Sequence, residues 1–327
     1  MQVFYDHDAD MSYLTGKTVA IIGYGNQGRA QGMNLRDSGV NVIVGNIQDA
    51  SFATAVADGF PALSIRDASA RADVLCLFLP DEVQAEIYRS DIQPVLRPGA
   101  TLNFAHGYTI HYGLIQPAAD VDVIMVAPRM IGVGVRERFL AGSGAPAFVA
   151  VEQDATGAAW SVALALARGI GATRPGALRS SFAEETEIDH FAEQAVWPVI
   201  MRLFRLAYEV LTERGLQPEA VVMDLYGSGE AAEIFHEMAA VGLFRQAAFH
   251  SRTSQYGTLS RGPRALPDSY RDVLNQTLDE IQGGVFSREW EAERRAGYPV
   301  FDSLKAEVQA HPLNAVEDRV QALLRQG

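Results

Sequence analysis

Three glycines between a β-branched run and a helical stretch constrain the fold more than any other feature of this chain. They are Gly23, Gly25 and Gly28, in the segment GYGNQG. In a strand–turn–helix unit, the first glycine permits a tight turn, the second lets the backbone approach a pyrophosphate, and the third allows close helix–strand packing. The helix N-terminus then offers free N–H groups to the anion. The motif predicts a nicotinamide dinucleotide site whose residues include Gly23, Tyr24, Gly25, Asn26, Gln27 and Gly28.

The end of the second expected strand bears on which nicotinamide cofactor is bound. The stretch VGNIQDAS, residues 44–51, contains no Lys or Arg. A 2′-phosphate needs a basic partner, whereas a free ribose hydroxyl tolerates an acceptor. Asp49 would repel a phosphate and Ser51 could hydrogen-bond one, so we expect NADH, with NADPH as the alternative. Asp49 either contacts the ribose or caps a helix, and we expect Leu79 and Pro80, after the third strand, to border the same cofactor.

Short apolar runs alternate with helical stretches in the first half of the chain, which is the pattern of a parallel sheet built from βαβ units. The expected strands are at residues 18–23, 41–45, 74–79, 100–104, 122–127 and 147–151, and the helices between them include 27–38 and 82–88. After Phe182 the stretches are long and amphipathic, with no convincing strand and a last helix expected at 315–326. We therefore predict an α/β Rossmann domain over residues 1–180 and an all-α domain over 181–327.

Composition excludes several classes of partner. The formal net charge of -13 argues against nucleic acid, whose phosphates favour Lys and Arg. The N-terminus lacks the pattern of a signal peptide, and no apolar run approaches the roughly 18 residues of a membrane helix. Cys76 lies in the run VLCLFL, which favours a buried core residue over a reactive thiol, and a single cysteine excludes an internal disulfide. We expect a cytoplasmic protein with no membrane or nucleic-acid partner.

Longer segments spread along nearly the whole chain match one known family. They are FYDHDADMSYLTGKTVAIIGYGNQGRA, LPDEVQAEIY, FAHGYTIHYG, DVDVIMVAPR, EETEIDHFAEQAV, QYGTLSRGPR and FSREWEAERRAGYPVF. The chain resembles ketol-acid reductoisomerase of the short-chain class. The resemblance implies a Rossmann domain followed by a knotted helical domain, which interlocks with that of a second subunit in a homodimer. It also implies that an acetohydroxy acid is isomerised by alkyl migration and reduced by a nicotinamide, with two Mg²⁺ ions holding the substrate oxygens.

The resemblance assigns roles to four residues. Asp189 and Glu193 lie four positions apart, on one helical face, where they can converge on one ion. On spacing alone, an acidic first turn favoured by the helix dipole is the alternative; the resemblance implies the first metal-binding pair. It also implies that His106 faces the nicotinamide or the substrate oxygens, and that Ser251 binds the substrate carboxylate.

The second metal-binding segment departs from the family pattern. The family has two glutamates four residues apart, and the matching positions here are Asp224 and Ser228. Aspartate can ligate Mg²⁺ with a shorter reach, but a serine hydroxyl is a poor neutral substitute. If this stretch is one helix, Glu230 lies about 240° around it from Asp224 and cannot easily replace the missing ligand. Asp224 remains a candidate ligand, and the two-metal cluster is in question.

A second departure follows the expected strand at 122–127. The family has a lysine in the run PKGPG, and this chain has PRMIG, which places Arg129 there. Arginine keeps the positive charge but cannot give up a proton at neutral pH. Met130, Ile131 and Trp197 add apolar bulk near the expected site. The candidate catalytic residues are His106, Arg129, Asp189 and Glu193.

Three functions fit these residues. Because the residues that support alkyl migration are the ones that differ, we expect an NAD(P)H-dependent reductase of a small 2-keto or imino acid, with the isomerase half weakened or lost. An iminium is already electrophilic and needs no Mg²⁺ pair. One alternative is a complete Mg²⁺-dependent ketol-acid reductoisomerase of branched-chain amino acid biosynthesis. The other is a non-catalytic cofactor-binding relative, against which the joint presence of His106, Asp189, Glu193 and Ser251 argues.

Overall fold

The computed structural model describes residues 1–325, which divide into two compact units. The first unit runs from Met1 to Asp189 and the second begins at His190. The division falls later than the boundary expected near Ser180, because helix α8 (Phe182–Phe191) begins on the first unit. Phe182 lies in the core of that unit, where its ring packs edge-on against Phe104. The start of α8 is therefore anchored to the sheet.

The described residues contain nine strands, all in one sheet. They are β1 (Val3–Phe4), β2 (Thr18–Ile22), β3 (Asn41–Gly45), β4 (Ala62–Leu63), β5 (Val74–Leu77), β6 (Thr101–Phe104), β7 (Asp122–Pro128), β8 (Ala147–Gln153) and β9 (Ala177–Arg179). Their order is β1-β9-β8-β7-β6-β5-β2-β3-β4. The six strands expected from the sequence are all present, whereas β1, β4 and β9 are too short to give a period-2 pattern.

Two strands, β8 and β9, run opposite to the others, which corrects the expectation of a parallel sheet. β8 runs antiparallel to β7, and β1 runs antiparallel to β9. The other neighbouring pairs are parallel. The alternation of apolar and polar residues reports which face a side chain occupies, but it carries no information on strand direction.

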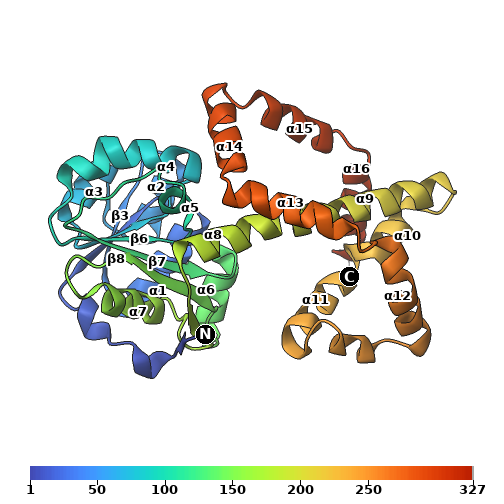
Figure 1. Cartoon of the computed structure of the whole chain (residues 1–327), viewed down its shortest axis with the longest axis horizontal. Helices are drawn as coiled ribbons and strands as arrows, with labels where there is room; N and C mark the ends of the chain where they lie inside the picture. Colours follow the sequence, from blue (N-terminus) through green and yellow to red (C-terminus); the bar gives the residue numbers. More distant parts are fainter. Residues whose placement is uncertain (326–327) are drawn as a thin grey trace. The chain divides into compact units, whose positions relative to one another are not determined.

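Helices cover both faces of the sheet (Figure 1). They are α1 (Asn26–Asp37), α2 (Ala50–Ala57), α3 (Ile65–Arg71), α4 (Asp81–Ile87), α5 (Tyr108–His111), α6 (Gly132–Leu140) and α7 (Ala159–Gly169). Short helical turns η1 (Asp6–Asp8), η2 (Met11–Leu14), η3 (Tyr88–Ile92) and η4 (Gln93–Val95) complete the first unit. Successive residues of β2 enter different core clusters, Val19 and Ile21 on one side and Ala20 and Ile22 on the other. A strand buried on both faces is typical of a parallel α/β sheet.

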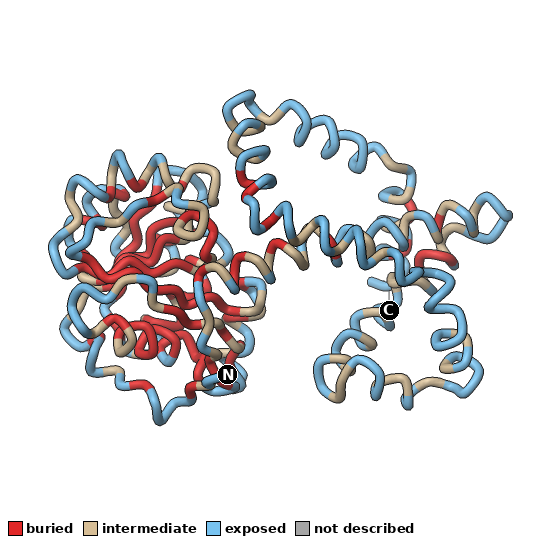
Figure 2. The backbone as a smooth tube through the Cα atoms, in the orientation of Figure 1, coloured by how far each residue is buried: buried red, intermediate tan, exposed pale blue. Residues whose placement is uncertain are grey.

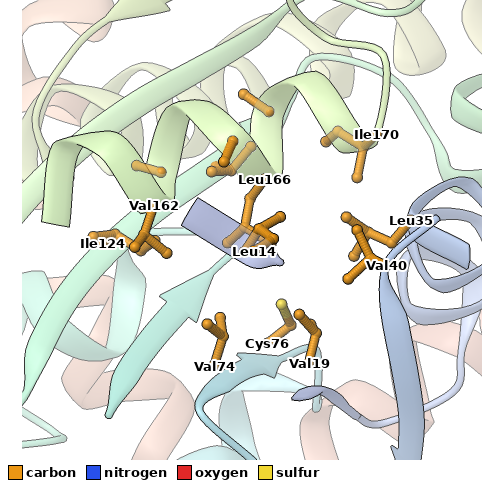
Figure 3. Close-up of a cluster of buried hydrophobic side chains, with 14 of the residues drawn as sticks. Leu14, Val19, Leu35, Val40, Val74, Cys76, Ile124, Val162, Leu166 and Ile170 are labelled. Atoms are coloured by element: carbon orange, nitrogen blue, oxygen red, sulfur yellow. The ribbon is translucent and has the colours of Figure 1, made fainter. Parts of the chain in front are cut away.

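The larger core cluster includes the one cysteine of the chain (Figure 3). Cys76 is 1% exposed and packs among residues such as Val19 and Val74. Burial raises the pKa of its thiol to about 12, so the thiolate is not formed near neutral pH. The prediction that Cys76 is a core residue is confirmed.

Within residues 190–325, the second unit contains helices joined by turns and no strand, as the sequence predicts. It contains α9 (Trp197–Glu213), α10 (Pro218–Val222), α11 (Glu230–Val241), α12 (Arg252–Ala265), α13 (Tyr270–Gln282), α14 (Val285–Arg295), α15 (Pro299–Gln309) and α16 (Leu313–Leu324), with the short turns η5 (Ala192–Val196), η6 (Met223–Gly227) and η7 (Arg245–Phe249). The expected end of the last helix at Gln326 lies outside the described residues. None of the described helices is long and apolar enough to cross a membrane.

The stretch from Pro218 to Val241 is not one helix. After α10 the chain forms the π-helical turn η6, and Gly229 then adopts a left-handed conformation with φ of 90° before α11 begins. A residue with a side chain rarely adopts this conformation, which glycine allows at little cost. The single-helix geometry that placed Glu230 about 240° around from Asp224 is therefore wrong.

Candidate active site

Site residues of the first unit lie at the carboxyl ends of neighbouring parallel strands. Gly23 follows β2, Leu79 and Pro80 join β5 to α4, His106 follows β6, and Arg129 follows β7. β2 pairs with β3 on one side and with β5 on the other, so the direction of the crossovers reverses there. In open α/β sheets, ligands bind outside the carboxyl ends of the strands at this switch point.

The glycine turn is shaped by close backbone contacts. Gly23 has φ of 94°, and a Cβ there would lie 2.7 Å from the carbonyl oxygen of Phe78. A Cβ on Gly28 would lie 2.0 Å from the carbonyl oxygen of Gly23, whereas a Cβ on exposed Gly25 would meet nothing within 4 Å. Two glycines therefore permit the turn and the helix–strand packing, and the third leaves an open backbone surface. This arrangement fits a dinucleotide pyrophosphate.

A cavity of about 510 Å³ opens beside this turn. It is lined by Tyr24, Gly25, Asn26, Arg29, Ala30, Met33, Ser51, Gly132, Val133, Arg136 and Glu137. The N-termini of α1 and α6 both reach it, and they pack so closely that a Cβ on Gly132 would lie 2.1 Å from the carbonyl oxygen of Asn26. Two helix N-termini beside one cavity favour an anionic ligand.

Asp49 serves as a helix cap. Its carboxylate accepts a hydrogen bond from the backbone N–H of Phe52 at 3.0 Å, at the start of α2. It also accepts from the Asn46 side chain at 2.8 Å. Oδ1 of the Asn46 side chain in turn accepts from the backbone N–H of Tyr24 at 3.1 Å. Of the two roles expected for Asp49, the structure shows capping, and the contact with ribose stays a prediction.

Arg29 is a basic residue that the sequence reasoning missed, because only the loop at 44–51 was considered. It lies on α1 and lines the same cavity as Ser51. Its guanidinium is bound to both carboxylate oxygens of Asp58, at 2.7 and 3.1 Å. These contacts hold the pKa of Asp58 below its ordinary value. Because Asp58 balances its charge, Arg29 is a weaker partner for a 2′-phosphate than an unpaired arginine would be.

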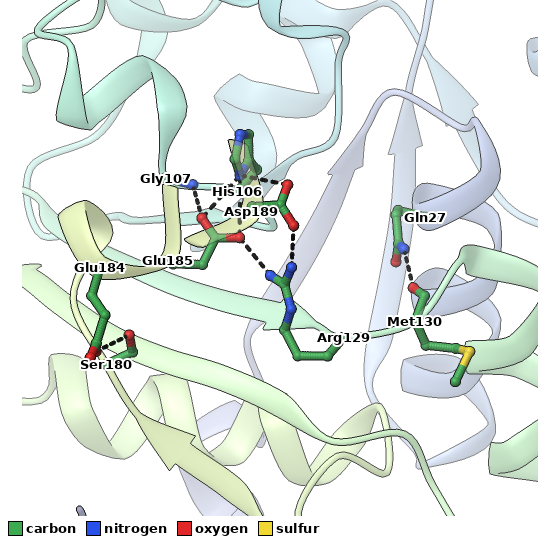
Figure 4. A network of polar contacts seen from close by, with 9 residues as sticks. All are labelled: Gln27, His106, Gly107, Arg129, Met130, Ser180, Glu184, Glu185 and Asp189. Carbon is green, nitrogen blue, oxygen red and sulfur yellow. Dashed lines mark hydrogen bonds and ion pairs between the residues drawn. The ribbon is translucent and has the colours of Figure 1, made fainter. Parts of the chain in front are cut away.

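The buried carboxylate of Glu185 lies at the centre of a group of polar contacts (Figure 4). Glu185, on α8, is 1% exposed and accepts three hydrogen bonds: from His106 Nδ1 at 2.9 Å, from the backbone N–H of Gly107 at 2.8 Å, and from Arg129 Nη1 at 2.8 Å. Glu185 was not among the predicted residues. The signal was present, since Glu185 precedes Asp189 by four positions, as Asp189 precedes Glu193.

Arg129 links Glu185 to Asp189. Its Nη2 donates to the Asp189 carboxylate while its Nη1 donates to Glu185. Asp189 also lies 3.8 Å from His106 Nδ1. The structure therefore brings together three of the four candidate catalytic residues: His106, Arg129 and Asp189.

Close packing of α8 against the strand ends maintains this group. A Cβ on Gly107 would lie 2.5 Å from the carbonyl oxygen of Phe182 and 2.5 Å from the Thr186 hydroxyl. Glycine at this position therefore lets α8 approach the loop after β6. The same approach brings Glu185 within reach of the Gly107 N–H and of His106.

Burial, hydrogen bonds and neighbouring charges shift the pKa values of His106, Glu185 and Asp81. Burial alone would lower the pKa of His106, but the hydrogen bond and charge of Glu185, with the charges of Asp81 and Asp189, raise it to about 9. Burial would raise the pKa of Glu185, and His106, Gly107 and Arg129 together lower it. Burial raises the pKa of Asp81, at the start of α4, to about 6. Near neutral pH, His106 is an imidazolium beside ionised Glu185.

His106, Glu185 and Asp189 have oxygen and nitrogen atoms close enough to surround a cation, all within 4.8 Å of one another. Their lone pairs, however, are engaged. Nδ1 of His106 donates to Glu185, so it has no lone pair for a metal, and Arg129 donates to both carboxylates. Mg²⁺ needs oxygen ligands in octahedral geometry. As arranged here, the group does not fit a divalent ion.

The remaining predicted residues belong to the second unit, and each is exposed. Glu193 lies in the π-helical turn η5. Asp224 lies in η6, and the Ser228 hydroxyl after it accepts from the backbone N–H of Glu230 at 3.4 Å. Ser251 caps α12 by accepting from the backbone N–H of Ser254 at 3.2 Å. Their roles toward metal or substrate stay predictions.

Comparisons with known proteins cover both units. Residues 13–176 match the family model "Acetohydroxy acid isomeroreductase, NADPH-binding domain", and residues 182–326 match "Ketol-acid reductoisomerase, C-terminal domain". The ketol-acid reductoisomerase (NADP(+)) of Pyrobaculum calidifontis is 43% identical over 325 residues, which is 99% of this chain and 98% of that protein. The corresponding protein of Pyrobaculum neutrophilum is 42% identical over 99% of both chains. The solved structure of an NADH-preferring ketol-acid reductoisomerase from an uncultured archean has a TM-score of 0.95 and 36% identity, covering 99% of each chain.

Proposed function

Because the chain belongs to the ketol-acid reductoisomerase family and is therefore an NAD(P)H-dependent oxidoreductase, we propose that it reduces a small 2-keto or imino acid, with the isomerase half weakened or lost. One observation carries the proposal. His106 is held by buried Glu185 at the end of β6, within the row of strand ends that begins with the glycine turn. A proton donor beside a dinucleotide cradle is what the reduction of C=O or C=N requires.

The chain's own residues account for the proton in this reaction. The turn of Gly23, Gly25 and Gly28 would hold a reduced nicotinamide, which would supply the hydride for the carbonyl or imine carbon. The oxygen or nitrogen of that double bond would then need a proton. Nδ1 of His106 donates to Glu185, so the Nε2–H is the group that protonates that atom. Glu185 stabilises the imidazolium before transfer and orients the ring. The neutral histidine then regains a proton from water.

Alkyl migration makes a further demand. It requires strong Lewis acids on the ketone and on the tertiary alkoxide. In the segment that matches the second metal-binding pair, Asp224 lies in the π-helical turn η6 and Ser228 directly follows it. One carboxylate is missing there, and the observed contact of Ser228 is with the backbone. This supports reduction without isomerisation.

A complete Mg²⁺-dependent ketol-acid reductoisomerase of branched-chain amino acid biosynthesis is the second candidate. It is favoured by identities of 43% and 42%, over nearly the full chain, with relatives that carry this name. The two candidates share the reductive step and differ only in the migration that precedes it.

One assay separates them. The protein is given 2-acetolactate or, separately, the 3-hydroxy-2-keto acid that migration would produce, each with NADH or NADPH and with or without Mg²⁺. We expect oxidation of the nicotinamide with the rearranged acid and not with 2-acetolactate. Formation of the dihydroxy acid from 2-acetolactate at an ordinary enzymatic rate would establish the second candidate. A folded protein that binds the cofactor but reduces none of a panel of 2-keto and imino acids would instead be a non-catalytic relative.

A pair of variants tests the missing residues directly. Ser228→Glu combined with Arg129→Lys restores the family pattern, and we expect it to gain activity with 2-acetolactate and Mg²⁺. Ser228→Ala with Arg129→Lys is the matched control and should gain none. Equal activity of the two double variants would show that position 228 does not limit isomerisation.

For the cofactor, we propose a preference for NADH. The support is the absence of Lys or Arg in residues 44–51 and the pairing of Arg29 with Asp58. Thermal unfolding with saturating NADH or NADPH measures the preference, and we expect the larger stabilisation with NADH. A larger stabilisation by NADPH would contradict the proposal.

We further propose a homodimer with interlocked helical domains. The support is the set of large apolar side chains that the second unit leaves exposed, including Met201, Leu203, Phe244, Phe249 and Leu259. Such surfaces usually mark protein interfaces. Light scattering during size-exclusion chromatography should give twice the chain mass of 35.5 kDa. A monomer at micromolar concentration would contradict the proposal.

The cytoplasmic location predicted from the sequence also remains a proposal. It is supported by the single cysteine, which is buried and free, as fits a reducing compartment. Fractionation of source cells with an antibody against the chain would test it, and recovery from the membrane or secreted fraction would contradict it.

A further inference from the structure

The guanidinium of Arg129 lies between two carboxylates of one helix. Glu185 and Asp189 are separated by one turn of α8, and Arg129 donates from Nη1 to the first and from Nη2 to the second. A planar fork with parallel N–H groups suits this bridging role better than a single ammonium would. The position between the two carboxylates is therefore occupied by a cation that belongs to the chain.

Several contacts fix Arg129 in this position. Its backbone N–H donates to the carbonyl oxygen of Pro146 at 2.8 Å. Its guanidinium carbon lies 5.1 Å from the centre of the Phe148 ring, within the range of a cation–π contact. The side chain is 29% exposed, so one side remains accessible. A guanidinium carries five N–H donors, which is more than the two carboxylate contacts use.

A divalent ion added between Glu185 and Asp189 would have to displace the Arg129 guanidinium, because this group already donates to both carboxylates. The ion would then lie close to the positive charge of that side chain. Asp81, at the start of α4, is a further acid whose charge acts on His106.

We propose that Arg129 is the resident cation of this site, taking the place between Glu185 and Asp189 that a divalent ion would otherwise occupy, so that the protein reduces its substrate without a metal. The class of substrate in this inference rests on the proposed function, whereas the test by metal binding does not depend on that function. The accessible side of the guanidinium then faces the acid substrate, whose carboxylate or carbonyl oxygen it can bind with its remaining donors.

Electron paramagnetic resonance of Mn²⁺ measures the prediction directly, because bound and free Mn²⁺ give distinct signals. We expect no stoichiometric Mn²⁺ binding by the full chain, with or without NADH. Arg129→Met should gain one site per chain that Mg²⁺ competes for, and Arg129→Met with Asp189→Asn should lose it again. Arg97→Met is the matched control: Arg97 pairs with Asp73 at 3.2 Å on the surface, and its removal frees one carboxylate without a second beside it.

Each outcome decides the inference. One Mn²⁺ per wild-type chain, lost in Asp189→Asn, would overturn it, and this measurement needs no Arg129 variant. A folded Arg129→Met protein that gains no site would also overturn it. If Arg129→Met fails to fold, Arg129→Gln replaces it, since it also removes the positive charge between the two carboxylates and should also admit Mn²⁺.

An activity measurement complements the binding experiment. If the wild-type protein reduces a 2-keto acid, the rate should change by less than about twofold between excess EDTA and millimolar Mg²⁺. A rate that depends on Mg²⁺ would contradict the inference. If no substrate is found, the proposed function fails while the Mn²⁺ titration still decides the role of Arg129.

Discussion

The two units of this chain differ in how completely each buries its own apolar residues. In the first unit, strand residues such as Ile21 and Leu75 are fully buried, with helices over both faces of the sheet. In the second, one small cluster that includes Tyr208 and Val320 is buried, and side chains such as Met201 remain 71% exposed. Figure 2 shows this contrast as buried strands in one unit and largely exposed or half-buried helices in the other.

The same contrast applies to the candidate site. His106, Arg129, Glu185 and Asp189 are positioned by one another and by buried backbone within the first unit. Among the exposed candidates of the second unit, the Ser251 hydroxyl makes a local contact with the Ser254 N–H at a helix end. The first unit therefore contains a preformed group of site residues, whose substitutions should have the larger effects.

Glu185→Gln should have the largest effect. It keeps the shape of a buried side chain but removes the charge that holds His106 and Arg129. We expect kcat/KM for a reducible acid to fall by about 100-fold or more. Glu184→Gln is the control on the same helix, since Glu184 is exposed and contacts the Ser180 hydroxyl. A Glu185→Gln protein within a few-fold of wild type would place the proton donor elsewhere.

Leu166→Ala should have the next largest effect, on stability. Leu166 lies on α7, is 2% exposed and faces the larger core cluster. Removing such a side chain typically costs about 2–5 kcal/mol of unfolding free energy. Met201→Ala, at an exposed position of α9, should cost less than about 0.5 kcal/mol in a monomer. Denaturant unfolding measures both. A loss at Met201 that matches Leu166 and grows on dilution would place Met201 in the interface of the proposed homodimer.

The pH dependence of the reaction should follow His106. Its pKa in the folded protein, about 9, is above the ordinary value of 6.5, so the proton is present below pH 9. The rate should be level between pH 7 and 8 and fall by about tenfold per pH unit well above pH 9. The stability that protonated His106 contributes is likewise full below pH 6.5 and is lost as the pH rises through 9. Plots of log kcat/KM against pH measure this limb, which Glu185→Gln should move to lower pH. A limb that does not move would assign it to another group.

Asp224→Asn should have the smallest effect. If the second unit holds no metal for the reductive step, the substitution should change kcat/KM for a plain 2-keto acid by less than about twofold. A loss of about 100-fold would show that Asp224 acts in the site. That result would favour the complete isomeroreductase, and residues of the second unit would then contribute to catalysis as those of the first do.

Local patterns in the sequence account for much of the first unit. The spacing of Gly23, Gly25 and Gly28 predicts the turn after β2, because Gly23 and Gly28 meet steric demands of that turn and Gly25 leaves its backbone open. His106 was predicted from its place after a strand. Because glycines weaken helices, an interruption of the helix near Gly229 could be predicted, whereas the π-helical turn before it could not.

The contacts of the site itself could not be predicted from such patterns. Arg129 and Glu185 are 56 residues apart in the chain, and Arg129 and Asp189 are 60 apart. Which carboxylate an arginine meets depends on the order of β6 and β7 and on where α8 crosses the strand ends. The direction of β8 was missed for a similar reason, because it is a property of the whole sheet.

One hydrogen bond connects the helix after the glycine turn with the strand end that precedes Arg129. The Gln27 side-chain amide, on the first turn of α1, donates at 2.9 Å to the carbonyl oxygen of Met130, the residue after Arg129 (Figure 4). This hydrogen bond fixes the start of α1 relative to the end of β7, which is followed by Arg129. If the cofactor binds at the glycine turn as proposed, loss of the Gln27 contact would change the distance between the nicotinamide and the substrate, so that the rate of hydride transfer would fall while both ligands still bind.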